Sequence, residues 1–317
     1  MFGDRFDGLD LVVLVVPDAA PLVELYHAGL GFEIEADAPP ADEALALLLG
    51  LAEDPSRVVH LGRGSGVGGG IVVVECPAAA AAPLTVPRTR RGVYALDFYL
   101  RDAAATEQEL TDDGWTFTSE AVHYDLPGTA IPVRERMLVQ PHSDLLHAMV
   151  QHRPGGTRSV LGTDAQGWCS EVVAVVVLTG DLTGARRFAA EALGCEEYFA
   201  GTFDGPAMER MLGFEAGEGL EASLFRGPAS RNARLEFARP VAPGGEPLPL
   251  ADEPTRRRVL PGLLVEDLDA TLERLSAHGQ VTAVEELTWL GTRRRAARLD
   301  TAYDVSLLLL GSETSGR

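Results

Sequence analysis

Apolar and polar positions follow the same order four times along this chain. Each time, a run of β-branched and large apolar residues leads into an acidic residue, an amphipathic segment and a glycine. The apolar run predicts a buried strand, and the amphipathic segment predicts a helix. The four stretches are LVVLVVPDAAPLVELYHAGLGF (11–32), ALDFYLRDAAATEQELTDDGW (95–115), AVVVLTGDLTGARRFAAEALGC (174–195) and LPGLLVEDLDATLERLSAHG (260–279).

An acidic residue stands where each predicted helix begins. These residues are Asp18, Asp102, Asp181 and Asp267, so they recur roughly every 80 residues, a period typical of a repeated supersecondary unit. A carboxylate at this position can accept hydrogen bonds from the free N–H groups of the first helical turn. The pattern therefore predicts one strand–helix unit used four times.

Each helix is followed by room for three shorter strands. In the first unit we expect them at roughly 31–36, 57–63 and 70–76, with a helical insertion near 41–52. In the second unit we expect them at roughly 115–125, 130–140 and 145–151. The chain is thus predicted to be an α+β protein of four βαβββ modules.

A segment rich in Gly, Ser and Thr, RPGGTRSVLGTDAQG (153–167), is the best candidate for a linker between domains. It predicts an N-terminal domain over 1–153, with modules 1–76 and 92–152. The C-terminal domain is then 168–317, with modules 168–238 and 255–312.

Composition narrows the classes of function. The net charge of −20 argues against nucleic acid as a partner, because nucleic-acid binding depends on clustered Lys and Arg. No apolar stretch approaches the ~20 residues of a membrane helix, and the first residues lack the apolar run of a signal peptide. We therefore expect a cytoplasmic protein without a membrane partner. The three cysteines lack metal-like spacing, so neither a disulfide framework nor a zinc knuckle is expected.

Three segments resemble one known group of proteins. They are LVVPDAAPLVELYHAGLGFE (14–33), LLVEDLDATLERLSAHG (263–279) and LVQPHSDLLHAMVQ (138–151). Together with the repeat, they resemble the vicinal oxygen chelate superfamily, which includes glyoxalases, bleomycin-resistance proteins and extradiol dioxygenases. The resemblance implies that the modules pair into two cup-shaped mixed sheets, one in each half of the chain. The alternative is another repeated ferredoxin-like α+β fold.

In that superfamily the cup holds a divalent metal and the substrate, with ligands from the first and last strands of a module. The first-strand positions here are Leu11, Ala95, Ala174 and Leu260. None of these side chains can bind a metal, which needs His, carboxylate or thiolate donors. Each cup then keeps about one donor, so we favour a metal-free member without a cofactor; Fe, Mn, Ni or Zn is the alternative.

The resemblance places His147 on a last strand, facing the cup of the N-terminal half. There it is a candidate metal ligand or acid–base catalyst; the alternative is a buried, hydrogen-bonded core histidine. His60, Glu75 and His147 are a candidate set for a non-standard metal site.

Glu236 takes the last-strand position of the third module and alternates with Arg234, so both point to the same side. It is a candidate ligand or catalytic base, and the alternative is a salt bridge with Arg234 or with the arginines of 293–298. The candidate substrate pocket comprises Leu11, Ala95, His123, Ala174, Arg234, Leu260 and Leu307.

These observations predict a small-molecule-binding protein of the glyoxalase/bleomycin-resistance type, acting as a binder or as a metal-independent catalyst. The alternative is a metal-dependent lyase, isomerase or dioxygenase with its site around His147. The N-terminal cup is expected to keep the chemistry. Whether the chain is an enzyme and whether it forms a homodimer are left open.

Overall fold

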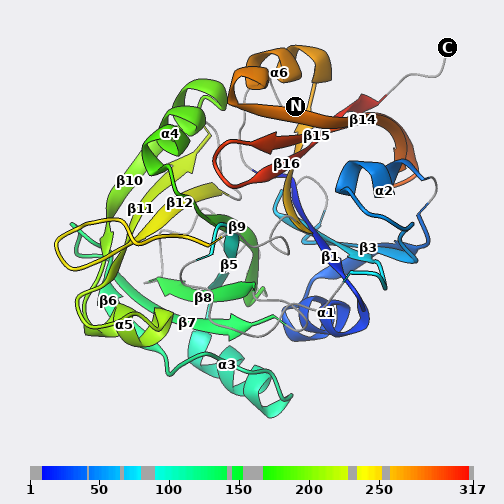
Figure 1. The fold of residues 1–317 in the computed structure, drawn as a ribbon. Coiled ribbons are helices and arrows are strands. Elements are labelled where there is room, and N and C mark those ends of the chain that lie inside the picture. Colours follow the sequence, from blue (N-terminus) through cyan, green and yellow to red (C-terminus); the bar gives the residue numbers. More distant parts are fainter. Residues whose placement is uncertain are drawn as a thin grey trace.

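The computed structural model describes residues 9–40, 43–64, 68–79, 90–140, 145–152, 167–227, 234–251 and 258–313. The predicted linker at 153–167 lies almost entirely outside these ranges. Within them, the four predicted βαβββ modules are present (Figure 1).

The first module comprises β1 (Leu11–Val16), α1 (Ala20–Glu24), β2 (Glu33–Ala38), α2 (Ala44–Leu49), β3 (Arg57–Gly62) and β4 (Gly70–Glu75). The second comprises β5 (Gly92–Leu100), α3 (Ala103–Asp112), β6 (Val122–Asp125), β7 (Pro132–Val139) and β8 (Leu146–His152).

The third module comprises β9 (Cys169–Leu178), α4 (Leu182–Arg187), β10 (Glu196–Phe203), α5 (Pro206–Leu212), β11 (Gly219–Arg226) and β12 (Arg234–Val241). The fourth comprises β13 (Val259–Val265), α6 (Leu268–Leu275), β14 (Gly279–Trp289), β15 (Thr292–Thr301) and β16 (Ser306–Glu313). Helices α1 and α4 each continue into a single π-helical turn, Leu25–Gly29 and Phe188–Ala192.

All four predicted acidic residues accept a backbone hydrogen bond at the start of their helix. The carboxylates of Asp102, Asp181 and Asp267 accept hydrogen bonds from the backbone N–H three residues ahead, at 3.1, 2.8 and 3.0 Å. At the first helix, which begins at Ala20, the Asp18 carboxylate accepts the Ala20 N–H, two residues ahead, at 3.0 Å. There Glu75, at the end of β4, accepts the Ala19 N–H at 3.0 Å.

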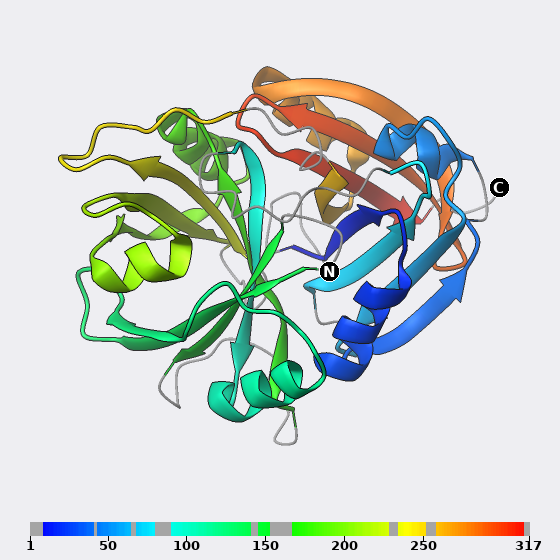
Figure 2. The same cartoon turned by 60° about the horizontal axis from the view of Figure 1, so that its bottom comes forward.

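The modules pair differently from the expectation that each half of the chain forms its own sheet. One eight-stranded sheet has the order β14-β15-β16-β13-β1-β4-β3-β2 and joins modules one and four. The other has the order β10-β11-β12-β9-β5-β8-β7-β6 and joins modules two and three. The seams are the antiparallel pairs β1 with β13 and β5 with β9. Figure 2 shows the two sheets side by side.

A single apolar core joins the two sheets. One face of every central strand contributes to it, for example through Val12, Phe98, Val175 and Leu309, all fully buried. The opposite faces of the two sheets are the insides of the two cups. The first cup is the apolar face of modules one and four, and the second cup is that of modules two and three.

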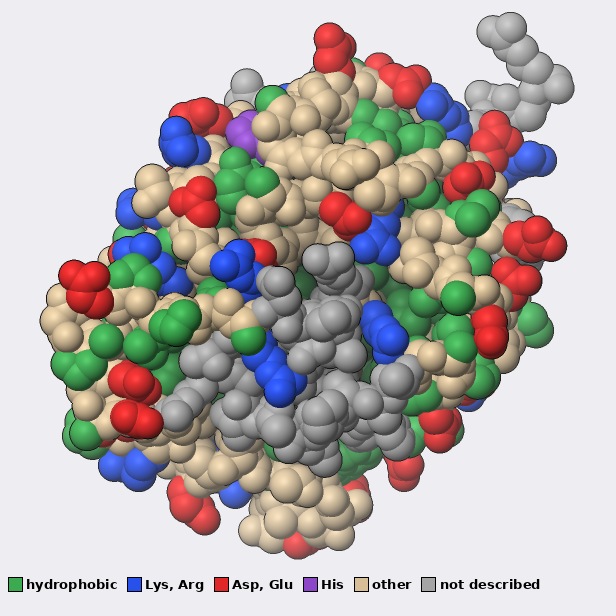
Figure 3. All heavy atoms as spheres, viewed as in Figure 1, with side chains coloured by type: hydrophobic (Ala, Val, Ile, Leu, Met, Phe, Trp, Pro, Cys, Tyr) green, Lys and Arg blue, Asp and Glu red, His purple; other side chains and the backbone are tan. Residues whose placement is uncertain are grey.

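No helix within the described ranges is both long and apolar enough to cross a membrane. On the face of the molecule seen in Figure 3, acidic side chains are interspersed with arginines.

The strand order confirms the prediction of an α+β protein with two eight-stranded, cup-shaped mixed sheets.

Candidate functional site

The second cup contains a cavity, with about 740 Å³ of empty space that is partly open to solvent. Its wall comes from strands of both modules two and three, and from helix α5. Neither half of the chain builds this site alone.

The cavity exists because small side chains line the floor of the cup. Across the sheet, one row of paired residues runs Arg234, Ala174, Asp97, Ala148 and Met137, on strands β12, β9, β5, β8 and β7. Asp97 therefore stands between two alanines, whose small side chains leave the cavity open beside its carboxyl group. Ala95, two residues earlier on β5, extends this low floor.

Three carboxyl groups line the cavity, and burial makes all three weak acids. Glu135 and Glu236 are 8% and 7% exposed. Burial raises the pKa of Glu135 to about 7. Burial and then the negative charge of Glu135 raise the pKa of Glu236 to about 8. Burial, together with the charges of Glu236 and Glu135, raises the pKa of Asp97 well above its usual value. The cavity therefore holds carboxyl groups that bind and release protons near neutral pH.

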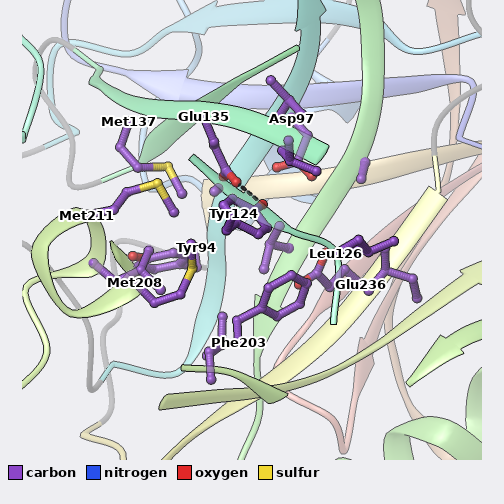
Figure 4. Close-up of a pocket in the computed structure, with 18 of the residues that line it drawn as sticks. Tyr94, Asp97, Tyr124, Leu126, Glu135, Met137, Phe203, Met208, Met211 and Glu236 are labelled. Atoms are coloured by element: carbon purple, nitrogen blue, oxygen red, sulfur yellow. Dashed lines mark hydrogen bonds between the residues drawn. The ribbon is translucent and has the colours of Figure 1, made fainter. Parts of the chain in front are cut away.

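The hydrogen bonds of these acids differ. Glu135 accepts a short hydrogen bond from the Tyr124 hydroxyl (Figure 4). Oδ1 of Asp97 is buried without a hydrogen-bond partner among the described residues. The Glu236 carboxyl group, likewise, makes no hydrogen bond or ion pair within the described part of the chain. Asp97 and Glu236 thus offer acceptor atoms to the cavity.

Arg234 supplies a positive charge to the same wall. Its guanidinium donates to the Val173 carbonyl at 3.2 Å, to the Tyr198 hydroxyl at 2.9 Å and to the Tyr99 hydroxyl. It also lies 5.6 and 5.4 Å from the centres of the Tyr99 and Tyr198 rings, within cation–π range. The predicted salt bridge between Glu236 and Arg234 is absent among the described residues, because neutral oxygens hold the guanidinium instead.

The other end of the cavity is apolar. Met137, Met208 and Met211 lie together there, and Figure 4 shows them on the side away from Asp97 and Glu236. Met208 and Met211 come from α5, which covers this end of the cup. Thioether side chains adapt to ligands of different shape. The cavity is therefore divided into an acidic end and a deformable apolar end.

The first cup is filled by its own helix. Leu45, Leu48 and Leu49 of α2 are buried against strands β14 and β15. Helix α2 occupies the place in module one that α5 occupies in module three, between the second and third strands. Both helices end at a glycine in the left-handed conformation, Gly50 and Gly213. The leucines of α2 thus fill the first cup, whereas the second cup keeps its cavity.

Most of the predicted pocket residues face a cup. Ala95, Ala174, Arg234 and Glu236 line the cavity. Leu11 and Leu260 face the inside of the first cup, where they are packed into its core. A glycine at position 262 leaves room for Leu11, since a Cβ there would lie 2.3 Å from Cδ1 of Leu11. Residues 11 and 260 thus face the first cup, and residues 95 and 174 face the second.

Two predicted pocket residues lie elsewhere. Leu307 points into the shared core, because Leu308 and Leu310 are the residues of β16 that face the cup. His123 lines a separate shallow hollow with Arg134 and His152 at the end of β6 and β7.

The expectation that His147 faces a cup was wrong. Its neighbours Leu146 and Ala148 face the second cup, so His147 points the opposite way into the shared core. There its ring stacks on Phe98, and its Nε2 lies 2.6 Å from the hydroxyl of Tyr26 on the first module. Burial lowers the pKa of His147 to about 3. The alternative reading, a buried and hydrogen-bonded histidine, describes this geometry.

The proposed set of His60, Glu75 and His147 does not come together. His60 faces the first cup and packs edge-on against Trp289. Glu75 points to the opposite face, where it binds the start of α1 and the hydroxyl of Ser56. Among the described residues, no three His, Cys, Asp or Glu side chains are grouped so that they could hold a metal ion. The donors present in the described chain do not fit the divalent metal that the fold implies.

The sequence analysis missed Asp97 and Glu135. Asp97 is the single acidic residue within the apolar strand ALDFYL, and it shares a face with Ala95, which the analysis did place in the pocket. A charged residue inside a buried strand was therefore an available signal. Glu135 lies in RERM between two arginines and resembles an ordinary residue of an exposed strand.

Comparisons with known proteins agree with this architecture. No family model matches the sequence, and no curated protein matches it either. Among solved structures, glyoxalase I from Zea mays matches with a TM-score of 0.64 and 12% identity, over 96% of this chain and 92% of that one. A proposed dioxygenase from Bacillus subtilis matches with a TM-score of 0.62 and 13% identity, over 98% and 86%. The chain therefore has a glyoxalase-like fold, with four modules in two eight-stranded sheets.

Proposed function

We propose that this protein is a member of the vicinal oxygen chelate superfamily that binds a small organic molecule in the second cup without the superfamily's metal ion. The observation that carries the proposal is the cavity between modules two and three, with acidic groups at one end and methionines at the other. Ligand sites are typically concave and mostly apolar, with a few converging polar groups.

The described residues contain no group of side chains suited to hold a metal ion, which supports the metal-free reading. The positions that would carry ligands in the first strands are Ala95 and Ala174 in the open cup. The metal-dependent alternative relied on His147, which faces away from the cup. Glu236 stays a candidate for proton transfer to or from a bound molecule, because burial raises its pKa to about 8.

A cavity-filling variant tests the proposal. Ala95→Phe would place a ring on the floor of the cavity. Ala200→Phe, on the exposed side of β10 in the same sheet, is the matched control. Ligand-observed NMR with uncharged aromatic probes such as benzyl alcohol should show binding to the wild type and to Ala200→Phe. Binding should disappear in Ala95→Phe. Equal binding to all three folded proteins would refute the site.

A further inference from the structure

The charges in the wall of the second cup do not balance. The titratable side chains that line the cavity are Asp97, Glu135, Glu236, Arg234, His152, Tyr94, Tyr99, Tyr124 and Tyr198. Burial, with the charge of Arg234, lowers the pKa of His152 to about 4, so this imidazole is neutral at physiological pH. Three carboxyl groups therefore share the cavity with one permanent cation. Two carboxyl groups have no cation of the protein to balance them.

Protons balance this excess when the cavity is empty. An ionised carboxylate is unfavourable in a buried site without a partner, which is why all three groups hold their protons to unusually high pH. A cationic ligand would replace those protons. The carboxyl groups also interact with one another, since the charges of Glu135 and Glu236 act on Asp97. A positive charge placed among them would favour the ionised form of all three.

Two of the carboxyl groups have oxygen atoms ready for a donor. Glu236 is only 7% exposed and makes no hydrogen bond within the described residues. Oδ1 of Asp97 is buried and unpartnered in the same part of the chain. No described residue donates a hydrogen bond to these atoms. A ligand with N–H groups would supply one.

The remaining walls suit an organic cation. Tyr94, Tyr124 and Phe203 line the cavity between its two ends (Figure 4), and aromatic faces attract ammonium groups. Met137, Met208 and Met211 can accept an apolar body of variable shape. A bare metal ion would need several oxygens within about 2.6 Å of one point, and the described residues contain no such group.

We propose that the ligand of the second cup is a small amine with an apolar body, bound as its ammonium ion. Asp97 and Glu236 supply the negative charge and the free acceptor oxygens, and the methionines contact the apolar body. This inference rests on the proposed function, because it requires the second cup to be the binding site.

Proton release is the signature of this binding mode. Burial and the charge of Glu135 raise the pKa of Glu236 to about 8, so Glu236 is largely protonated in the empty protein below pH 7. The pKa of Asp97 is raised as well, so holding an ammonium ion requires ionisation that burial opposes. Amine affinity should therefore rise between about pH 6 and pH 8.5, while an ordinary aliphatic amine stays charged, as a lysine with its pKa near 10.4 does. An anionic ligand would behave in the opposite way, because it would need the carboxyl groups to stay protonated.

Isothermal titration calorimetry with three matched probes tests the inference. Benzylamine, benzyl alcohol and benzoate share one ring and differ in charge. We expect benzylamine to bind at pH 8.5 about tenfold more tightly than benzyl alcohol, as a charged hydrogen bond would allow. Titrations near pH 7, in two buffers of different ionisation enthalpy, should show proton release on binding. At pH 6 the affinity for benzylamine should fall about tenfold.

Two variants locate the effect. Glu236→Gln and Asp97→Asn should each weaken benzylamine about tenfold or more, a larger loss than either causes for benzyl alcohol. The matched control is Glu273→Gln, an exposed glutamate on α6 that lies outside the cavity. It should bind like the wild type.

The possible outcomes separate this inference from the proposed function. Tighter binding of benzoate than of benzylamine, or an amine affinity independent of pH, would overturn the amine assignment while the second cup remains a binding site. Failure of all three probes to bind the wild type, or equal binding to Ala95→Phe, would overturn both.

Discussion

The hydroxyl of Tyr26 lies 2.6 Å from Nε2 of His147, although 121 residues separate them in the chain. Tyr26 lies in the π-helical turn that follows α1, in module one. His147 lies on β8, which belongs to the other sheet. Gln140 donates to the same hydroxyl at 3.4 Å. This buried contact joins the two sheets through the shared core. It assigns His147 a structural role at this junction.

Removing the hydroxyl should weaken the protein and leave the cavity intact. Tyr26→Phe leaves Nε2 of His147 without its partner, and Nδ1 already lacks one among the described residues. A buried unsatisfied group costs about 1–3 kcal/mol. We expect urea unfolding to show a loss of that size. Tyr303→Phe, which removes the half-buried 3.2 Å contact with His278, is the control and should cost less. A large loss of ligand binding in a still stable Tyr26→Phe protein would contradict this role.

The acids of the second cup should make the protein less stable as the pH rises. Glu135 and Glu236 titrate at about 7 and about 8 in the folded chain, and near 4.3 when unfolded. The folded state therefore binds more protons between pH 4.3 and pH 8, so the free energy of unfolding falls as the pH rises through this window. Glu236→Gln removes one of these groups. Between pH 5 and pH 8.5, the free energy of unfolding should therefore fall less for Glu236→Gln than for the wild type. The difference between the two proteins should be on the order of a few kcal/mol. An equal change in the free energy of urea unfolding between the two pH values, in both proteins, would argue against a buried, protonated Glu236.

Helix α2 offers a direct test of why the first cup is closed. Leu48 is fully buried in that cup, whereas Leu47, its neighbour on the same helix, is 59% exposed. Leu48→Ala should cost about 2–5 kcal/mol and leave an apolar hollow, while Leu47→Ala should change stability by less than ~0.5 kcal/mol. Chemical denaturation measures both. A similar effect of the two substitutions would mean that α2 does not fill the cup.

Metal content separates the metal-free reading from its alternative. Protein purified without a chelator should contain Fe, Mn, Ni and Zn at well below one ion per chain, because the described residues contain no adequate donor set. Plasma emission spectroscopy of the purified protein measures this directly. Asp97→Asn and His147→Ala are the informative variants. One ion per chain in the wild type, lost in either variant, would reverse the conclusion.

Strand and helix positions could be predicted because local patterns determine them. The runs of Val and Leu at 11–16 and 174–178 became β1 and part of β9, and Asp181 and Asp267 cap their helices as expected. These features depend on neighbours within a few residues. Sequence patterns report such features well.

The pairing of modules and the direction of His147 could not be predicted in the same way. The first strands of all four modules are mostly apolar, so composition does not distinguish β13 from β5 as the partner of β1. In β8 both faces are buried, and LHAMV is therefore apolar without alternation. A shift of one residue moves every side chain to the other face. The same ambiguity misplaced Leu307 in the run of leucines of β16.

The antiparallel seams between β1 and β13 and between β5 and β9 give the chain a crossed construction. Cutting it in the 153–167 region would yield two fragments, each holding one half of both sheets and each exposing two unpaired strand edges. Such fragments would need each other to fold, and mixing them should regenerate both cups at once. The molecule thus consists of two halves that complete each other's sheets, and the cavity of the second cup is lined by residues from both halves.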